Sequence, residues 1–238
     1  MGISVCIATY NGEKYLEEQL DSILSQLGDD DEVIISDDGS NDNTLQIIDG
    51  YNDPRILFFK NKSKKGVNHN FENALKNARG SIIFLADQDD IWLPNKVQVC
   101  VNELLESDIV VSNCIVVDVA GLVIHPSYFE AANSGKGFLK NIYKSSYLGC
   151  CLAFRRDVLI KVLPIPTNLM LFHDWWFGFI AECCFKVKFI DTPCMYYRRH
   201  GETNSNTLSK SKFSLGSKIS FRLQLLYLGL KRIIKIRY

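Results

Sequence analysis

The stretch "FLADQDDIWL", from Phe84 to Leu93, places three carboxylates directly behind an apolar run. Asp87, Asp89 and Asp90 lie within four positions of one another. Clustered carboxylates repel each other and are costly beside apolar side chains unless a positive partner compensates them. Two carboxylates separated by one residue at a strand end can both face one hard divalent cation, which keeps positions open for phosphate oxygens. Acids ahead of a proline are also common at helix N-termini, so the pattern alone leaves both interpretations open.

Strand, polar loop and helix alternate along the first 106 residues, and the acidic stretch belongs to the last of these units. Strands are expected at 2–9, 33–36, 56–60 and 81–86, and helices at 16–27, 43–51, 70–78 and 94–106. Gly28 is expected to end the first helix in a left-handed conformation. This alternation predicts a Rossmann-like α/β fold with a mostly parallel sheet flanked by helices. Loops rich in Asp, Gly and Asn follow the carboxyl ends of the strands, where open α/β sheets bind ligands.

The second half has another pattern but no internal repeat and no low-complexity linker. Residues 108–125 predict a strand, a turn at Ala120–Gly121 and a second strand. The segment "SSYLGCCLAFRRDVL" predicts a strand that leads into a helix, and "FHDWWFGFIAECC" predicts a short amphipathic helix. Two more strands are expected at Lys186–Ile190 and Met195–Arg199. This half therefore completes the same domain.

Composition indicates an ordinary globular chain in a reducing compartment. The 238 residues are 47% hydrophobic and 23% charged, which is enough for a substantial core and excludes a disordered or fibrous protein. The eight cysteines form neither a CxxC pair nor a Cys/His metal spacing, and most lie among apolar residues as reduced thiols do. No secretory signal pattern and no uncharged apolar run of ~18 residues is present. A cytoplasmic location is expected.

The C-terminal tail is basic. Eight of the 27 basic residues follow Glu202, and none of the 27 acidic residues does. At 100° per residue one helix face carries Ile219, Leu223, Leu226, Leu230 and Ile233. The opposite side carries Lys218, Arg222, Lys231, Arg232 and Lys235. Such a helix is typical of binding at the inner face of the plasma membrane. A helix that packs on the body or dimerises, with a solvated basic face, is the alternative.

Several segments together resemble family 2 glycosyltransferases, the inverting, nucleotide-sugar-dependent enzymes of the GT-A fold. The matching segments are "ISVCIATYNGEKYLEEQLDSI", "EVIISDDGSNDNT", "ARGSIIFLADQDDIWLPNKV", "GCCLAFRR", "HDWW" and "YYRRHGETN". They follow the family's order and cover most of residues 3–204. The resemblance implies a GT-A catalytic domain at 1–205, with a nucleotide-binding half at about 1–106 and an acceptor-binding half at about 107–205. The basic amphipathic tail occupies 206–238.

The resemblance also assigns residues to the nucleotide. It places Thr9 and Tyr10 against the base, with Glu13 close behind. Asp38 would accept the N3–H of uracil or thymine, which selects UDP- or dTDP-sugars because adenine and cytosine carry an unprotonated N3. Asp37 either assists or only caps the turn. By itself "DDGS" is a sequence of turn formers.

In the acidic stretch the resemblance gives Asp87 to the ribose and the metal side, with Gln88 also in the nucleotide-sugar site. Asp89 would be the main protein ligand of the Mg²⁺ or Mn²⁺ ion that bridges the two phosphates, and Asp90 would orient the loop. Such an ion neutralises the departing nucleoside diphosphate as a Lewis acid. His200 either completes the metal shell or is a surface loop residue beside a glycine.

"HDWW" nominates Asp174 as the base that takes the proton of the acceptor hydroxyl, since burial beside tryptophans increases the basicity of a carboxylate. A simple helix cap is the alternative interpretation. His173 stands where the family more often has Glu, so any role of that acid is absent. Gly149, Cys150 and Trp175 are expected to form the acceptor site.

Two basic pairs are further candidates for phosphate contacts, Lys64–Lys65 and Arg155–Arg156.

The expected activity is transfer of a sugar from a UDP- or dTDP-sugar to a carbohydrate acceptor, lipid-linked or free, in bacterial surface polysaccharide or glycan biosynthesis. The segments look most like the rhamnosyltransferase-type subgroup, which makes dTDP-L-rhamnose the first donor to test. A nucleotidyltransferase is the alternative enzyme class. It would require a Gly-rich, Lys/Arg-bearing phosphate loop after the first strand, and "TYNGEKY" does not have that pattern. An inactive sugar-binding or scaffold protein predicts broken acidic motifs, whereas Asp38, Asp87, Asp89 and Asp174 are all present. No nucleic-acid partner is expected.

Overall fold

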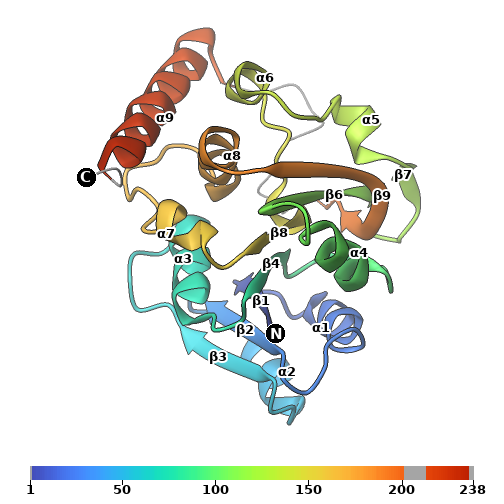
Figure 1. The fold of residues 1–238 in the computed structure, drawn as a ribbon. Helices are drawn as coiled ribbons and strands as arrows, with labels where there is room; N and C mark the ends of the chain where they lie inside the picture. The colour runs from blue at the N-terminus through green and yellow to red at the C-terminus, as the bar shows by residue number, and fades with distance from the viewer. Residues whose placement is uncertain (1, 201–212, 236–238) are drawn as a thin grey trace.

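One nine-stranded sheet runs through the computed structural model, which describes residues 2–200 and 213–235 (Figure 1). Its strands are β1 (Ile3–Thr9), β2 (Glu32–Asp37), β3 (Ile56–Lys60), β4 (Ile82–Asp87), β5 (Ile91–Trp92), β6 (Ile109–Val117), β7 (Val123–His125), β8 (Leu152–Arg155) and β9 (Val187–Arg198). They follow the order β3-β2-β1-β4-β8-β6-β9-β5, and β7 pairs with β6 outside this path. The sheet contains strands from both halves of the chain. The expected boundary near residue 106 therefore does not divide it into two sheets.

The helices lie on both faces of this sheet. They are α1 (Leu16–Leu24), α2 (Thr44–Gly50), α3 (Val67–Asn77), α4 (Lys96–Glu103), α5 (Tyr128–Ala132), α6 (Phe138–Tyr143), α7 (Val158–Val162), α8 (His173–Cys184) and α9 (Leu215–Lys235). In Figure 1, α3, α7, α8 and α9 lie to the left of the central strands, and α1 and α4 lie to the right. Helices α5 and α6 and strand β5 were not predicted from the sequence, because they are short and have little periodicity.

Strands β1 to β4 are parallel, and their register decides where the site lies. The interior of β1 is a continuous apolar run with no exposed surface from Val5 to Ile7, as expected for a strand covered on both faces. Thr9 at the end of β1 is paired with Asp37 of β2, and Ala8 is paired with Asp87 of β4. The parallel register therefore brings the polar ends of three strands to one edge.

The C-terminal half makes the sheet mixed, where a mostly parallel one was expected. β8 is antiparallel to β4 and to β6, while β9 returns parallel to β6. The two strands expected near 186–190 and 195–199 are one strand, β9, which shifts register against β6 between Ser112 and Asn113. A bulge keeps the strand continuous while it bends.

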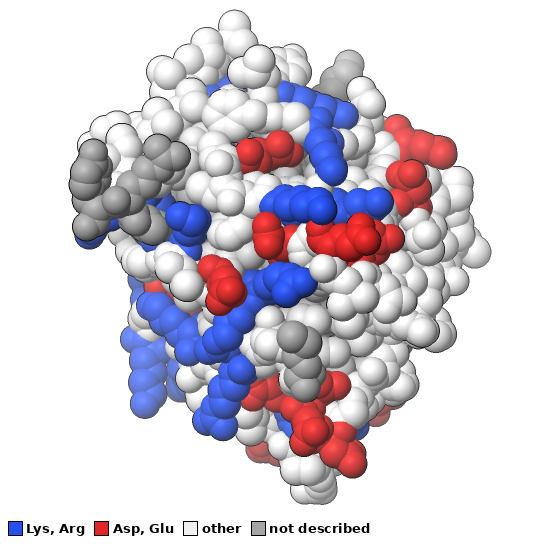
Figure 2. All heavy atoms as spheres, in the orientation of Figure 1, with Lys and Arg blue, Asp and Glu red and all other residues white. Residues whose placement is uncertain are grey.

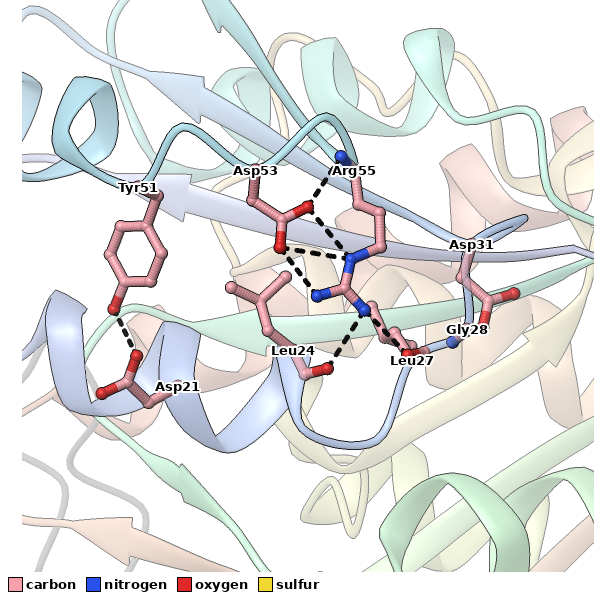
Figure 3. Close-up of polar contacts among 8 residues, drawn as sticks. All are labelled: Asp21, Leu24, Leu27, Gly28, Asp31, Tyr51, Asp53 and Arg55. Carbon is pink, nitrogen blue, oxygen red and sulfur yellow. Dashed lines mark hydrogen bonds and ion pairs between the residues drawn. The ribbon is translucent and has the colours of Figure 1, made fainter.

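Helix α1 ends at Leu24, earlier than the expected stop at Gly28 (Figure 3). Arg55 is held by Asp53, with 2.7 Å between Arg55 Nη2 and Asp53 Oδ2, and donates to the carbonyls of Leu24 and Leu27. A guanidinium thus satisfies the unpaired carbonyls of the helix end, so no left-handed glycine is required there.

The tail helix α9 packs on the body through a face that differs from the expected one. Phe221, Leu225 and Gly229 are buried, and a Cβ atom at Gly229 would overlap the ring of Phe179 in α8. Arg222 and Arg232, expected on a solvated face, lie over the rings of Trp175 and Trp176 at 5.6 and 5.5 Å from the ring centroids.

The exposed side of α9 is apolar, and it carries Ile219, Leu223 and Leu230. The expected tail boundary near 206 and the basic residues Lys210, Lys212 and Arg237 lie outside the described residues. Within 2–200 and 213–235, none of the helices combines the length and the apolar character that crossing a bilayer requires.

Gly229→Ala should lower the free energy of unfolding by about 1–3 kcal/mol, because the added methyl group forces α9 away from Phe179. Urea denaturation of the purified chain measures the change. Gly216→Ala in the same helix is the control, since a Cβ atom there has almost no neighbours and alanine favours a helix by up to about 1 kcal/mol. Equal stabilisation by both substitutions would contradict the packing of α9 on α8.

Candidate functional site

A cleft of about 850 Å³ opens at the carboxyl ends of β1, β2 and β4. This volume is within the usual range for a small-molecule site. The first half of the chain lines it with Thr9, Tyr10, Lys14, Tyr15, Asp38, Lys65, Asn70, Asp87, Gln88 and Asp89. The second half contributes Leu148, Gly149, Phe172, His173, Asp174, Tyr197 and His200. Residues from both halves of the chain therefore face one space.

Asp38 is held firmly at one end of the cleft. Its carboxylate accepts hydrogen bonds from Asn61 Nδ2 at 2.9 Å and from the backbone N–H of Gly66 at 2.7 Å. Nearby, the ammonium group of Lys65 lies 5.8 Å from the centroid of the half-exposed Tyr10 ring. A fixed acceptor beside an exposed aromatic ring is suited to a flat heterocycle that has an N–H at its edge.

Asp37 and Glu13, two of the predicted nucleotide residues, lie outside the cleft. The buried carboxylate of Asp37 accepts from Thr9 Oγ1 at 3.0 Å and from the backbone N–H groups of Gly39 and Ser40. Glu13 accepts from the backbone and side chain of Asn43. Both acids therefore shape the loops that carry the cleft residues.

Gln88 joins the loop after β1 to the acidic loop after β4. Its side-chain oxygen accepts from Tyr10 N–H at 2.9 Å, and its side-chain nitrogen donates to the Tyr10 carbonyl at 3.1 Å. A Cβ atom at residue 12 would lie 2.5 Å from this oxygen, so Gly12 leaves the space that Gln88 needs. Gln19 adds a hydrogen bond of 2.7 Å to the carbonyl of Asp87.

The acidic loop holds a concentrated negative charge. Asp90 is buried and accepts from Arg198 N–H at 3.0 Å, which agrees with a role in orienting the loop. Burial, with Asp89 and then Asp174 as negative neighbours, raises the pKa of Asp87 above its ordinary value. Burial, with Asp89 and Asp87 nearby, also raises the pKa of Asp90. These carboxylates lack enough positive charge, which a bound cation would supply.

Two groups of residues could hold that cation. His200 Nε2 lies 2.7 Å from Asp89 Oδ2, so both predicted metal ligands meet at one point. Asp87, Asp90 and Cys150 also have ligand atoms within 4.8 Å of one another. Burial raises the pKa of the Cys150 thiol, and a protonated thiol is a poor ligand for hard cations. The carboxylates and the imidazole therefore fit Mg²⁺ or Mn²⁺ better through Asp89 and His200.

Asp174 lies in the first turn of α8 and faces the cleft from the other side. Its Oδ1 accepts from the backbone N–H of Trp175 at 2.8 Å, and only 8% of the residue is exposed. Burial raises the pKa of Asp174 to about 7. A carboxylate with this pKa can take a proton efficiently near neutral pH.

His173 beside it lies against the ring of Phe71, with 4.2 Å between the ring centroids, and burial lowers its pKa to about 3. Among residues 2–200 and 213–235, no hydrogen-bond partner is found for either ring nitrogen, so a neutral imidazole is buried at the position before Asp174. Gly149 leaves room for this ring, because a Cβ atom there would lie 2.5 Å from His173 Nε2.

Other expected acceptor and phosphate contacts also lie outside the cleft. Cys150 is buried behind Gly149, and Trp175 lies beneath Arg222 of α9 at a separate small cavity. Arg155 donates to the carbonyls of Leu104 and Ser107, and Arg156 donates to those of Ala78 and Gly80. Residue 155 is paired with Ile82 at the start of β4, so both arginines are at the edge of the sheet opposite to the cleft.

Asn70, Tyr15 and Tyr197 are cleft residues that the sequence analysis missed. Asn70 donates to the Thr9 carbonyl at 3.0 Å and accepts from Ser36 Oγ at 2.6 Å. A polar residue on the buried face of α3, between Val67 and Phe71, was the available signal. The two tyrosines gave no such signal, because tyrosine occurs both buried and exposed in folded proteins.

The chain belongs to glycosyl transferase family 2, whose model matches residues 4–163. It is 30% identical over 244 residues to the dTDP-rhamnosyl transferase RfbG of Shigella flexneri, which covers 95% of this chain and 79% of that protein. It is 29% identical over 217 residues to the uncharacterized glycosyltransferase alr2836 of Nostoc sp., covering 86% of this chain and 66% of the relative. The chain therefore spans about two thirds of the length of that relative.

Solved structures show the same GT-A fold. Residues 1–349 of S. aureus TarS in complex with UDP-GlcNAc superpose with a TM-score of 0.68 at 23% identity, covering 98% of this chain and 72% of that one. The mannosyltransferase PcManGT from Pyrobaculum calidifontis, in complex with GDP-Man and Mn²⁺, gives a TM-score of 0.60 at 20% identity, covering 98% and 64%. The predicted family and fold class are thus confirmed.

Proposed function

We propose that this chain is an inverting, metal-dependent glycosyltransferase that moves a sugar from a UDP- or dTDP-sugar to a carbohydrate hydroxyl in polysaccharide biosynthesis. One observation carries the proposal. A single cleft is lined by a fixed acceptor at Asp38, by a carboxylate–imidazole pair at Asp89 and His200, and by a buried carboxylate at Asp174. Asp38 would bind the nucleobase, Asp89 and His200 would hold the metal ion at the diphosphate, and Asp174 would accept the proton of the acceptor hydroxyl.

The end of the cleft that contains Asp38 and Tyr10 is suited to a uracil or thymine ring. Asp38 presents an acceptor that its two other partners, Asn61 Nδ2 and Gly66 N–H, hold in one orientation. It would pair with the N3–H of uracil or thymine, whereas N3 of adenine and of cytosine carries no proton. Tyr10 would provide the surface on which the ring stacks, and the ammonium group of Lys65, 5.8 Å from the centroid of the Tyr10 ring, would attract the phosphates.

Asp89 and His200 would hold Mg²⁺ or Mn²⁺ beside the donor diphosphate, with Asp87 on the ribose side. When bound, the ion stabilises the negative charge on the departing nucleoside diphosphate. Gln88 ties the acidic loop to the turn at Tyr10, so the groups for the phosphates and for the base keep a fixed separation. This preorganisation lowers the cost of ordering the site when the donor binds.

Asp174 would act as the general base. It removes the proton of the acceptor hydroxyl, whose oxygen forms a bond to the anomeric carbon while the bond to the nucleoside diphosphate breaks on the opposite face. One displacement of this kind inverts the anomeric centre. The pKa of Asp174, raised to about 7 by burial, suits proton removal from a hydroxyl near neutral pH.

The similarity to RfbG makes dTDP-L-rhamnose the first donor to test, with UDP-glucose, UDP-galactose and UDP-N-acetylhexosamines next. The sugar portion of the donor would lie between the acidic loop and Gly149, where His173 offers a neutral ring.

The exposed face of α9 would bind an anionic bilayer surface and bring the cleft to a lipid-linked acceptor. Its exposed apolar residues recur at helical spacing, and they are Leu215, Ile219, Leu223, Tyr227, Leu230 and Ile234. Lys231 and Lys235 border this stripe, and α9 contains no acidic residue. Figure 2 shows mainly uncharged side chains along the visible side of α9. Apolar side chains flanked by lysines are suited to the interface of an anionic membrane.

Asp38→Ala should weaken binding of UDP and dTDP by roughly 10- to 100-fold, because a hydrogen bond to a charged group contributes about 1.5–3 kcal/mol. Calorimetric titration with UDP, dTDP, GDP and ADP in the presence of Mn²⁺ measures the preference. Asp42→Ala, which removes a carboxylate from the same loop outside the cleft, should keep the preference of the parent chain. A parent chain that binds all four nucleotides equally would refute the role of Asp38.

Asp174→Asn should lower kcat by roughly 10²- to 10⁴-fold with donor affinity unchanged, as expected for loss of a general base. In the parent chain the ionised carboxylate is the active form. Its kcat/KM should therefore fall as pH decreases through about 7 and be constant above that value. Asp191→Asn, at an exposed carboxylate of β9, is the matched control. Turnover of Asp174→Asn at the parent rate would remove Asp174 as the base.

Replacing Leu223 and Leu230 together by glutamate should reduce binding to anionic phospholipid vesicles at least about tenfold, since burial of each leucine contributes about 1.5–3 kcal/mol. Sedimentation of the chain with vesicles measures the bound fraction. Leu105→Glu, at an exposed leucine just after α4, should bind as the parent does. If the double variant pellets equally well, α9 does not dock on the bilayer.

A further inference from the structure

Arg198, the last residue of β9, joins three segments behind the acidic loop. Its side chain is 8% exposed. The guanidinium donates through Nε to the carbonyl oxygen of Asp89 at 3.0 Å and through Nη2 to Glu18 Oε2 of α1 at 2.5 Å. Its backbone N–H donates to Asp90 Oδ1 at 3.0 Å. One buried residue therefore fixes the acidic loop to both β9 and α1.

Tyr15 extends this arrangement to His200. The guanidinium carbon of Arg198 lies 4.9 Å from the centroid of the Tyr15 ring. His200 stacks on Tyr15 with 5.0 Å between ring centroids and an interplanar angle of 30°. His200 follows Arg198 by two residues, so the same guanidinium that holds the backbone of Asp89 also contacts the ring on which His200 rests.

We propose that Arg198 is a positioning residue that fixes Asp89 and His200 at the separation required to hold one divalent cation before that cation binds. The proposal rests on the function proposed above. Arg198 is not among the residues that line the cleft, so it acts through Asp89 and His200 and not on the substrate. Without this residue, repulsion within the acidic loop would favour spreading of the carboxylates and would separate Asp89 from His200.

The geometry requires a guanidinium in particular. Arg198 makes a hydrogen bond to a carbonyl, an ion pair with a carboxylate and a contact with an aromatic ring at the same time. A planar fork of donors can satisfy these three partners together, whereas the single ammonium group of lysine cannot. Side chains that orient metal ligands in this way typically contribute 10- to 100-fold to metal affinity.

The test is a titration of the full chain with Mn²⁺ in the presence of saturating UDP, followed by the electron paramagnetic resonance signal of free Mn²⁺. Arg198→Lys should raise the Kd for Mn²⁺ at least about tenfold. Thermal unfolding without metal shows whether the variant is folded. Arg199→Lys, one residue further along and without a contact to the acidic loop among the described residues, should bind Mn²⁺ as the parent does.

A second variant keeps the test informative if Arg198→Lys does not fold. The Glu18 side chain is 57% exposed, so Glu18→Gln should fold normally while it releases one partner of the guanidinium. We expect its Kd for Mn²⁺ to rise about two- to fivefold, in the same direction as Arg198→Lys. Parent-like Mn²⁺ affinity in either folded Arg198→Lys or Glu18→Gln would overturn the positioning role alone. A parent chain that binds UDP but no Mn²⁺ would overturn the metal site itself.

Discussion

The parallel pairing of β1 with β2 and β4 is the constraint on which the rest of the structure depends. It aligns Thr9 with Asp37 and Ala8 with Asp87, so three polar loops leave the sheet at the same edge. The apolar interiors of these strands are buried on both faces, and a slip of one residue would turn their side chains to the opposite face of the sheet. The buried apolar side chains that fix the strand register therefore also fix where the carboxylates lie.

Charge balance is the second requirement, because burial brings acids together that would otherwise separate. Arg198 at the end of β9 supplies a guanidinium and His200 just beyond it supplies an imidazole, both more than a hundred residues away along the chain. The second half of the sheet is therefore part of the same electrostatic arrangement. It also provides the wall of the cleft that carries Asp174.

The sequence was most informative where a pattern had one physical meaning. Each strand of the parallel half was anticipated, because an apolar run bounded by Gly, Asp and Asn has few alternatives. Asp38, Asp87, Asp89 and Asp174 face one cleft; the strand ends indicated the first three, and the resemblance to the family nominated Asp174. For Asp37 the sequence left assistance to Asp38 and capping of the turn both open, because only the direction of the side chain at the strand end distinguishes a turn residue from a cleft residue.

Features that depend on contacts between distant segments could not be predicted from local sequence patterns. Helix α9 has apolar residues on two faces, and only contact with α8 selects Phe221, Leu225 and Gly229 as the buried one. Arg155 and Arg156 follow a strand that is antiparallel to β4, which moves them to the far edge of the sheet. The direction of β8 depends on its pairing with β4 and β6, and no local sequence pattern indicates that pairing.

The amide pair between Gln88 and Tyr10 has a consequence for how such enzymes can diverge. Its two hydrogen bonds, together with the empty space at Gly12, make the turn after β1 and the loop after β4 behave as one rigid unit. A loop after β4 without glutamine at residue 88 would leave the Tyr10 backbone groups without these partners, and a turn after β1 without glycine at residue 12 would place a methyl group against the amide. In this chain, glycine at residue 12 and glutamine at residue 88 therefore depend on each other, whereas residue 10 contributes only backbone groups.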